Sequence, residues 1–321
     1  IVRDSLDFST AICSPNGLTL AQGVCTPLLV GSFYDAMQAL LNKYKNKIRS
    51  KDIFIFNDPF VAGGQHLPDI FIAKPIFYKE LYCGWAVTVA HHSDVGGIVA
   101  GSNAIGGEEI FQEGLRIPII KIEEQGVPNR AVWDLIALNV RTPDEVHGDL
   151  QAQIASCNSG ESGMLQLFER YGVNNVLTYG DQLQDYAERI TRAEIKDFPD
   201  GTYKFTDHID GLGEDPDPLV LQTTVIISGD SISVDWTGTA DQVSAGINPS
   251  FSYTKSATYA ALRSVMESEI PNCYGFTLPI TVSAPLGSLV NPRFPAPCGA
   301  RGITGFRMID CLFGALATAL P

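Results

Sequence analysis

The feature that most constrains the fold is a change in hydrophobic periodicity near residues 195–200. From about residue 129 to residue 193, charged and apolar residues alternate at helical spacing. Over 201–236, polar residues alternate with β-branched or aromatic ones and turn signals separate the runs, which is typical of an antiparallel sheet. This pattern predicts an α+β fold in which mixed or antiparallel β-sheets pack with helices. We expect two subdomains: 1–197, which includes the helical segment, and 198–321, which is β-rich with one helix.

The first part of the chain also predicts a sheet. Three short β-rich runs, separated by glycine and proline, occupy 52–60, 69–77 and 80–90, and we expect them to be strands of one sheet. Apolar residues three and four positions apart over 32–48 predict an amphipathic helix, and 251–267 is a second such segment.

Composition excludes several classes of partner. A chain of 321 residues with a net charge of -14 and no strong cluster of Lys and Arg is a poor candidate for binding nucleic acid or an anionic membrane. Apolar stretches end well before the roughly 20 residues that a membrane span requires. Seven cysteines without a CxxC pair argue against a disulfide framework and against a thiolate zinc site, so a reducing cytoplasm is expected. The two ends of the chain suggest a fragment of a longer protein.

Histidine and aspartate gather in two short motifs, "GGQHLPD" (63–69) and "HHSDVGG" (91–97). Imidazole and carboxylate together favour zinc-like and transition-metal ions. Because Pro68 disfavours the helical region for the residue before it, we expect 66–69 to be extended, with His66 and Asp69 on the same side. If the preceding strand continues, His91 and His92 point to opposite faces, so only one of them reaches the ion. The spacing does not say which.

Further polar residues lie close to these motifs. Asn57 and Asp58 follow a strand and precede a proline, which suits a turn as well as contacts to a substrate or to the ligands. The charged residues of the segment "EEIFQEGLRIP" are expected to be solvated: Glu108, Glu109, Glu113 and Arg116. Among them, Glu113 is the candidate to test as an acid or base. His147 and His208 are interpreted as surface residues. The chain contains neither a GxxxxGK[ST] phosphate loop nor a GxSxG motif.

The order of several motifs resembles the hydantoinase B/oxoprolinase family. These motifs are "DFSTAI", "NDPFVAGGQHLPDI", "AHHSDVGG", "EIFQEGLRIP", "GDLQAQIA", "VDWTGTADQVSAGIN" and "PLGSLVNP". The resemblance spans essentially the whole chain. It implies a large subunit of a hetero-oligomer whose hydantoinase A-type partner uses ATP, in keeping with the missing phosphate loop. Relatives in this family include N-methylhydantoinase and 5-oxoprolinase, which open cyclic amides, and the acetone and acetophenone carboxylases.

The resemblance also assigns roles to residues. It implies that a divalent ion (Zn, Mn or Fe) is held by His66, Asp69 and His91, and that His92 and Asp94 support the ligands or handle protons. Gln65 stands where the family more often has Thr, a departure that concerns contacts to the substrate and leaves the ligands intact.

The expected function is therefore that of a metal-dependent hydrolase subunit acting on a cyclic amide such as a hydantoin, oxoproline or lactam. Phosphorylation of the carbonyl oxygen in the partner would make the amide electrophilic, and water activated at the metal would attack it. His92 or Asp94 would orient or deprotonate this water, while Asn57 and Asp58 would help to shape the pocket. Two alternatives remain open: a subunit of an ATP-dependent ketone carboxylase, and a scaffold that only stabilises the ATP-using partner.

Overall fold

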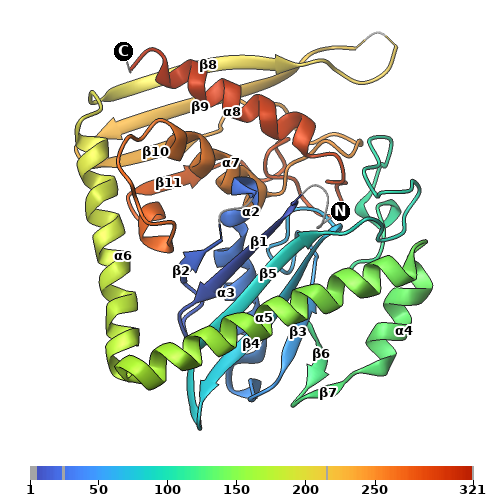
Figure 1. Cartoon of the computed structure of the whole chain (residues 1–321). Helices are drawn as coiled ribbons and strands as arrows, with labels where there is room; N and C mark the ends of the chain where they lie inside the picture. The colour runs from blue at the N-terminus through green and yellow to red at the C-terminus, as the bar shows by residue number, and fades with distance from the viewer. Residues whose placement is uncertain (1–5, 24–25, 215, 320–321) are drawn as a thin grey trace.

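The computed structural model describes residues 6–23, 26–214 and 216–319, and it has the predicted α+β fold with two sheets (Figure 1). The first sheet has the strand order β2-β1-β5-β4-β3-β6-β7, and all its neighbouring strands are antiparallel. Its strands are β1 (Phe8–Cys13), β2 (Thr19–Gln22), β3 (Ile53–Phe56), β4 (Asp69–Tyr78), β5 (Leu81–His91), β6 (Ile120–Glu124) and β7 (Val127–Pro128).

Helices cover both faces of the first sheet, which explains why its central strands are apolar at almost every position. Phe54 and Phe56 on β3 pack with the residues of α3 (Ser32–Tyr44). The alternate residues Ile53 and Ile55 share the opposite core with α5 (Pro143–Tyr171). Since successive side chains of a strand point to opposite faces, a strand buried on both sides loses its polar alternation. The helix α4 (Arg130–Asn139) joins the core on the α5 side.

The second sheet has the order β11-β10-β9-β8 and is mixed, because β11 pairs with β10 in parallel. Its strands are β8 (Gly201–Ile209), β9 (Leu219–Ser228), β10 (Ser231–Asp235) and β11 (Ile280–Ser283). A core that includes the buried Trp236 forms between this sheet and the helices α6 (Val173–Lys196), α7 (Phe251–Ser264) and α8 (Gly302–Leu316). In Figure 1, α5 crosses the first sheet, α6 runs from it toward the second sheet, and α8 lies across β8 and β9.

Most of the central strands and several helices were expected from the sequence. The predicted strands over 52–60, 69–77 and 80–90 correspond to β3, β4 and β5 of one sheet, and the predicted helices at 32–48 and 251–267 correspond to α3 and α7. The helices α2 (Pro27–Val30) and α8 and the strands β1, β2, β6, β7 and β11 were not predicted. The division at 197/198 stays a prediction, although α6 ends at Lys196 and β8 begins at Gly201. None of the helices described is long and apolar enough to cross a membrane.

Candidate metal centre

Two of the proposed ligands lie side by side at the end of the β4–β5 hairpin. Asp69 is the first residue of β4, His91 is the last residue of β5, and the two are directly paired in the antiparallel register. Such pairing brings side chains on the same face within a few Å of one another. The two residues are therefore held together by the backbone of a central, buried pair of strands.

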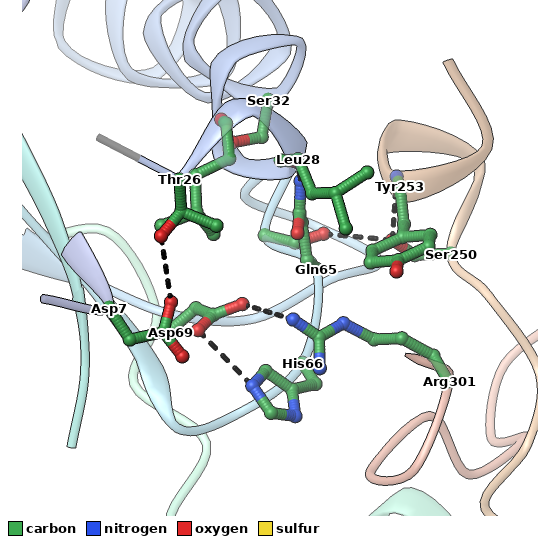
Figure 2. A network of polar contacts seen from close by, with 12 residues as sticks. Asp7, Thr26, Leu28, Ser32, Gln65, His66, Asp69, Ser250, Tyr253 and Arg301 are labelled. Carbon is green, nitrogen blue, oxygen red and sulfur yellow. Dashed lines mark hydrogen bonds and ion pairs between the residues drawn. The ribbon is translucent and has the colours of Figure 1, made fainter. Parts of the chain in front are cut away.

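The third ligand, His66, is placed by a turn, and the extended conformation expected for 66–69 is wrong. The backbone N–H of Asp69 donates to the carbonyl of His66 at 3.2 Å, which closes a turn that contains Pro68. The turn brings His66 Nε2 to 3.1 Å from Asp69 Oδ1, so the two side chains converge by a different backbone route (Figure 2).

Among the described residues, His66, Asp69 and His91 form a group that could hold a metal ion. Their ligand atoms all lie within 4.8 Å of one another. His66 Nε2, Asp69 Oδ1 and His91 Nδ1 are buried and have no hydrogen-bond partner, since the 3.1 Å approach of Nε2 and Oδ1 lacks hydrogen-bond geometry. Unpaired buried polar atoms are costly, and atoms of this kind that converge fit a cation. The donor set therefore fits a divalent ion such as Zn, Mn or Fe.

The tautomer of His66 is fixed by its other ring nitrogen. His66 Nδ1 lies 2.9 Å from the carbonyl oxygen of Gly299, which can only accept, so Nδ1 carries the proton and Nε2 carries the lone pair. Burial lowers the pKa of His66 to about 4, and the nearby charge of Arg301 acts in the same direction. The ring is neutral at pH 7, as a metal ligand must be.

Asp69 is paired with a residue from the far end of the chain. Arg301 donates to Asp69 Oδ2 at 2.6 Å, leaving Oδ1 facing His66, and its guanidinium lies 5.0 Å from the centre of the Tyr253 ring. Burial alone would raise the pKa of Asp69, but the neighbouring His66 and Arg301 hold this pKa below its usual range. Asp69 is thus ionised, and Figure 2 shows it between His66 and Arg301.

His92 is directed toward helix α5. Gln153 donates through its Nε2 to the carbonyl of Ile70 at 2.9 Å and to Thr88 Oγ1 at 3.2 Å. Its Oε1 therefore accepts from His92 Nε2 at 2.9 Å, and His92 Nδ1 keeps an unpaired, buried lone pair. Burial lowers the pKa of His92. Of the two adjacent histidines, His91 belongs to the three-residue group described above, and His92 is held by α5.

Three of the other candidate residues form contacts within the protein. Asp94 accepts from Gly96 N and from the backbone and side chain of Arg141. Burial opposes the charge of Asp94, but these donors, with Arg141 first, hold its pKa below the ordinary value.

Asn57 and Asp58 fix the loop that leads to His66. The Asn57 side chain donates to the carbonyls of Leu67 and Leu115 and accepts from Ile117 N. Asp58 accepts from Phe60 N, Val61 N and the guanidinium of Arg116. The expectation that Arg116 is merely solvated is wrong, because it is paired with a buried carboxylate and stacks on Phe111 and Phe294.

Glu113 is completely buried, so the expectation that it is solvated is wrong. Its Oε1 accepts from Gly299 N at 2.5 Å, while Oε2 has no partner. Burial raises the pKa of Glu113 to about 7, against the opposing effect of the backbone donors and Arg301. Glu108, Glu109, His147 and His208 are all exposed, as expected.

Sequence reasoning missed Gly299, Arg301 and Gln153 as parts of the site. Gly299 and Arg301 belong to "PCGARG", a stretch rich in glycine whose arginine is the available signal. Gln153 lies in an ordinary helical segment, where nothing in the sequence marks it.

Two imidazoles and one carboxylate, beside the paired ends of two central strands in an α+β fold, define a protein with a candidate mononuclear metal centre. The sequence matches the hydantoinase B/oxoprolinase family over residues 1–321, and the chain belongs to this family. It is 35% identical to a putative D-/L-hydantoinase component of Pseudomonas sp. (strain NS671), over 100% of this chain and 57% of that protein. The chain thus spans little more than half the length of that relative.

Two solved structures share the fold. The crystal structure of the ATP-dependent caprolactamase from Pseudomonas jessenii has a TM-score of 0.93 and 32% identity, covering 99% of this chain and 55% of that one. A nucleotide-free structure of acetone carboxylase has a TM-score of 0.91 at 19% identity, covering 99% of this chain and 44% of that one. At this lower identity the similarity concerns the fold alone.

Proposed function

We propose that the chain is the metal-dependent part of an ATP-dependent cyclic-amide hydrolase of the hydantoinase/5-oxoprolinase type. The observation that carries the proposal is the convergence of three buried, unpaired ligand atoms, His66 Nε2, Asp69 Oδ1 and His91 Nδ1, in a member of this family. The relatives described as a putative hydantoinase component and as an ATP-dependent caprolactamase support the substrate class. ATP would be used by a hydantoinase A-type partner, in a hetero-oligomer that we place in the cytoplasm.

His66, Asp69 and His91 would hold the ion. When bound, a divalent ion supplies a Lewis acid that lowers the pKa of water and stabilises developing negative charge. Asp69 contributes one negative charge, which Arg301 offsets, and an imidazole binds a metal ion in its neutral form. The centre would therefore favour an anionic ligand, as a substrate phosphorylated on its carbonyl oxygen would be.

We propose His92 as the proton acceptor. Its Nδ1 has a buried lone pair without a partner, and Gln153 fixes this tautomer. Asp94, Asn57 and Asp58 have their oxygen atoms engaged by neighbouring groups, so we propose that they hold the loops that carry His66 and the "HHSDVGG" motif. Removal of a proton from water by His92 would accompany attack on the activated carbonyl carbon.

The test is elemental analysis of the full-length protein purified with its ATP-using partner. We expect near-stoichiometric Zn, Mn or Fe in the wild type, loss of the metal in His66→Ala and His91→Ala, and retention in His147→Ala, which changes an exposed histidine. ATP-dependent ring opening of hydantoin, 5-oxoproline and caprolactam would then be assayed. A wild type without metal would contradict the proposal and favour a scaffold. Activity only with a ketone and bicarbonate would favour a carboxylase.

A further inference from the structure

We propose that Glu113 is a positioning residue: it holds the Cys298–Arg301 turn against two of the metal ligands and does not itself act on substrate. The inference rests on the proposed function, because it assumes that His66 and Asp69 are metal ligands. It concerns a carboxyl group that the proposed reaction leaves without a role.

A single residue links Glu113 to His66. Gly299 donates its N–H to Glu113 Oε1 at 2.5 Å and accepts from His66 Nδ1 through its carbonyl oxygen at 2.9 Å. His66 and Gly299 are 233 positions apart in the sequence. The carbonyl of Gly299 selects the Nδ1–H tautomer, and this tautomer leaves Nε2 free for the ion. Glu113 holds the N–H of the residue whose carbonyl orients His66, while Ala300 N, in the peptide unit of that carbonyl, donates to Gly246.

The same turn reaches Asp69. Arg301 N donates to the carbonyl of Cys298 at 3.2 Å, which closes the turn, and its guanidinium donates to Asp69 Oδ2 at 2.6 Å. Oδ2 is thereby occupied, and Oδ1 is the oxygen that remains for the ion. A shift of this turn would therefore disturb two ligands together.

Close packing restricts the conformations that the Cys298–Arg301 turn can adopt. A Cβ at Gly299 would lie 3.0 Å from Glu113 Oε1 and 3.1 Å from the carbonyl oxygen of Ser102, so a side chain here would have to displace the carboxyl group. On the other side, Asn248 donates to the carbonyl of Pro297 at 2.8 Å, and Ala300 N donates to the carbonyl of Gly246 at 2.7 Å. Glu113 is the only side chain among the described residues that binds the N–H of Gly299.

Two substitutions separate positioning from proton transfer. Glu113→Gln keeps the length of the side chain and one acceptor oxygen for Gly299 N but removes the carboxylate. Glu113→Asp keeps the carboxylate and shortens its reach by one methylene. Positioning predicts that the Gln variant behaves as the wild type and the Asp variant is impaired. A proton-transferring role predicts the reverse order. Glu108→Gln, at an exposed glutamate of the same segment, is the control.

The primary readout is the tautomer of His66, measured from its side-chain ¹⁵N shifts in the metal-free full-length protein. We expect Nδ1–H in the wild type and in Glu113→Gln, and a mixture in Glu113→Asp. Competition with a chelator for Zn²⁺ then gives the affinity, which we expect to fall by about 10- to 100-fold in Glu113→Asp and to change less than about 3-fold in Glu113→Gln. Thermal melts check that each variant is folded.

A wild-type tautomer and unchanged Zn²⁺ affinity in Glu113→Asp would overturn the inference. Ring-opening activity lost in Glu113→Gln but retained in Glu113→Asp would also overturn it. If the wild type binds no metal, the proposed function fails, while the tautomer measurement still decides whether Glu113 positions His66.

Discussion

Replacing Glu113 by Gln should stabilise the metal-free protein at neutral and alkaline pH, and the gain should disappear in acid. The carboxyl group is fully buried, and burial raises its pKa from 4.5 to about 7. Between these two values the folded state holds a proton that the unfolded state has released. The stability of the wild type therefore falls as the pH rises from about 4.5 to 7, and this loss is complete above pH 7.

The size of the effect follows from the difference between the two pKa values. At about 1.4 kcal/mol for each unit, ionising the buried carboxyl group costs about 3 kcal/mol. Glutamine does not titrate, so the stability of Glu113→Gln relative to wild type should increase by about 3 kcal/mol between pH 4 and pH 8. For a chain of this length, with an unfolding entropy of about 2 cal/mol/K per residue, this corresponds to roughly 4 °C in Tm.

The assay is urea denaturation of the metal-free wild type, Glu113→Gln and the control Glu108→Gln at a series of pH values. Other groups titrate in the same range, but they do so in all three proteins and cancel in the difference. A difference between Glu113→Gln and wild type that does not change with pH would refute the reasoning, because it would mean that this carboxyl group is ionised and hydrated in the folded protein.

Three further outcomes are expected. In the metal-free protein, burial of His66 lowers its pKa from 6.5 to about 4, so the stability of the wild type falls as the pH drops through this range. His66→Gln should lack about 3 kcal/mol of this loss in the same urea series. Equal dependence of the two stabilities on pH would contradict this prediction. Gly148→Ala should raise the stability measured in urea by about 1 kcal/mol, because this exposed position lies inside α5 and nothing is within 4 Å of the new Cβ. Gly246→Ala should lower the stability, because its Cβ would lie 2.2 Å from the carbonyl oxygen of Ala104. Gln153→Leu should cost about 1–3 kcal/mol in urea denaturation by leaving the buried His92 without its partner, while elemental analysis should find the metal content unchanged.

Three strands of the first sheet, β3, β4 and β5, could be predicted because local patterns determine them. Alternating and continuous apolar runs bounded by glycine and proline located β3, β4 and β5, and helical periodicity located α3 and the stretch that contains α4, α5 and α6. The proximity of Asp69 and His91 then follows from the pairing of two consecutive antiparallel strands.

The rest of the site depends on contacts that no local pattern reveals. The turn at 66–69 replaces the expected extended segment, because the N–H of Asp69 bonds to the His66 carbonyl before β4 begins. Gly299 and Arg301 reach the ligands from a segment of mixed glycine and proline, and Gln153 meets His92 only after α5 packs on the sheet. The α8 helix was missed because the passage before it suggested only loops.

The contact between His66 and Gly299 sets the order in which the centre can mature. A ribosome makes the β4–β5 hairpin more than 200 residues before the turn that selects the tautomer of His66 and pairs Asp69 with arginine. A nascent chain can therefore carry the metal-binding side chains without the arrangement that leaves their lone pairs available. We expect metal loading to follow the completion of this region, so that chains truncated before Gly299 remain free of metal even if their first sheet has folded.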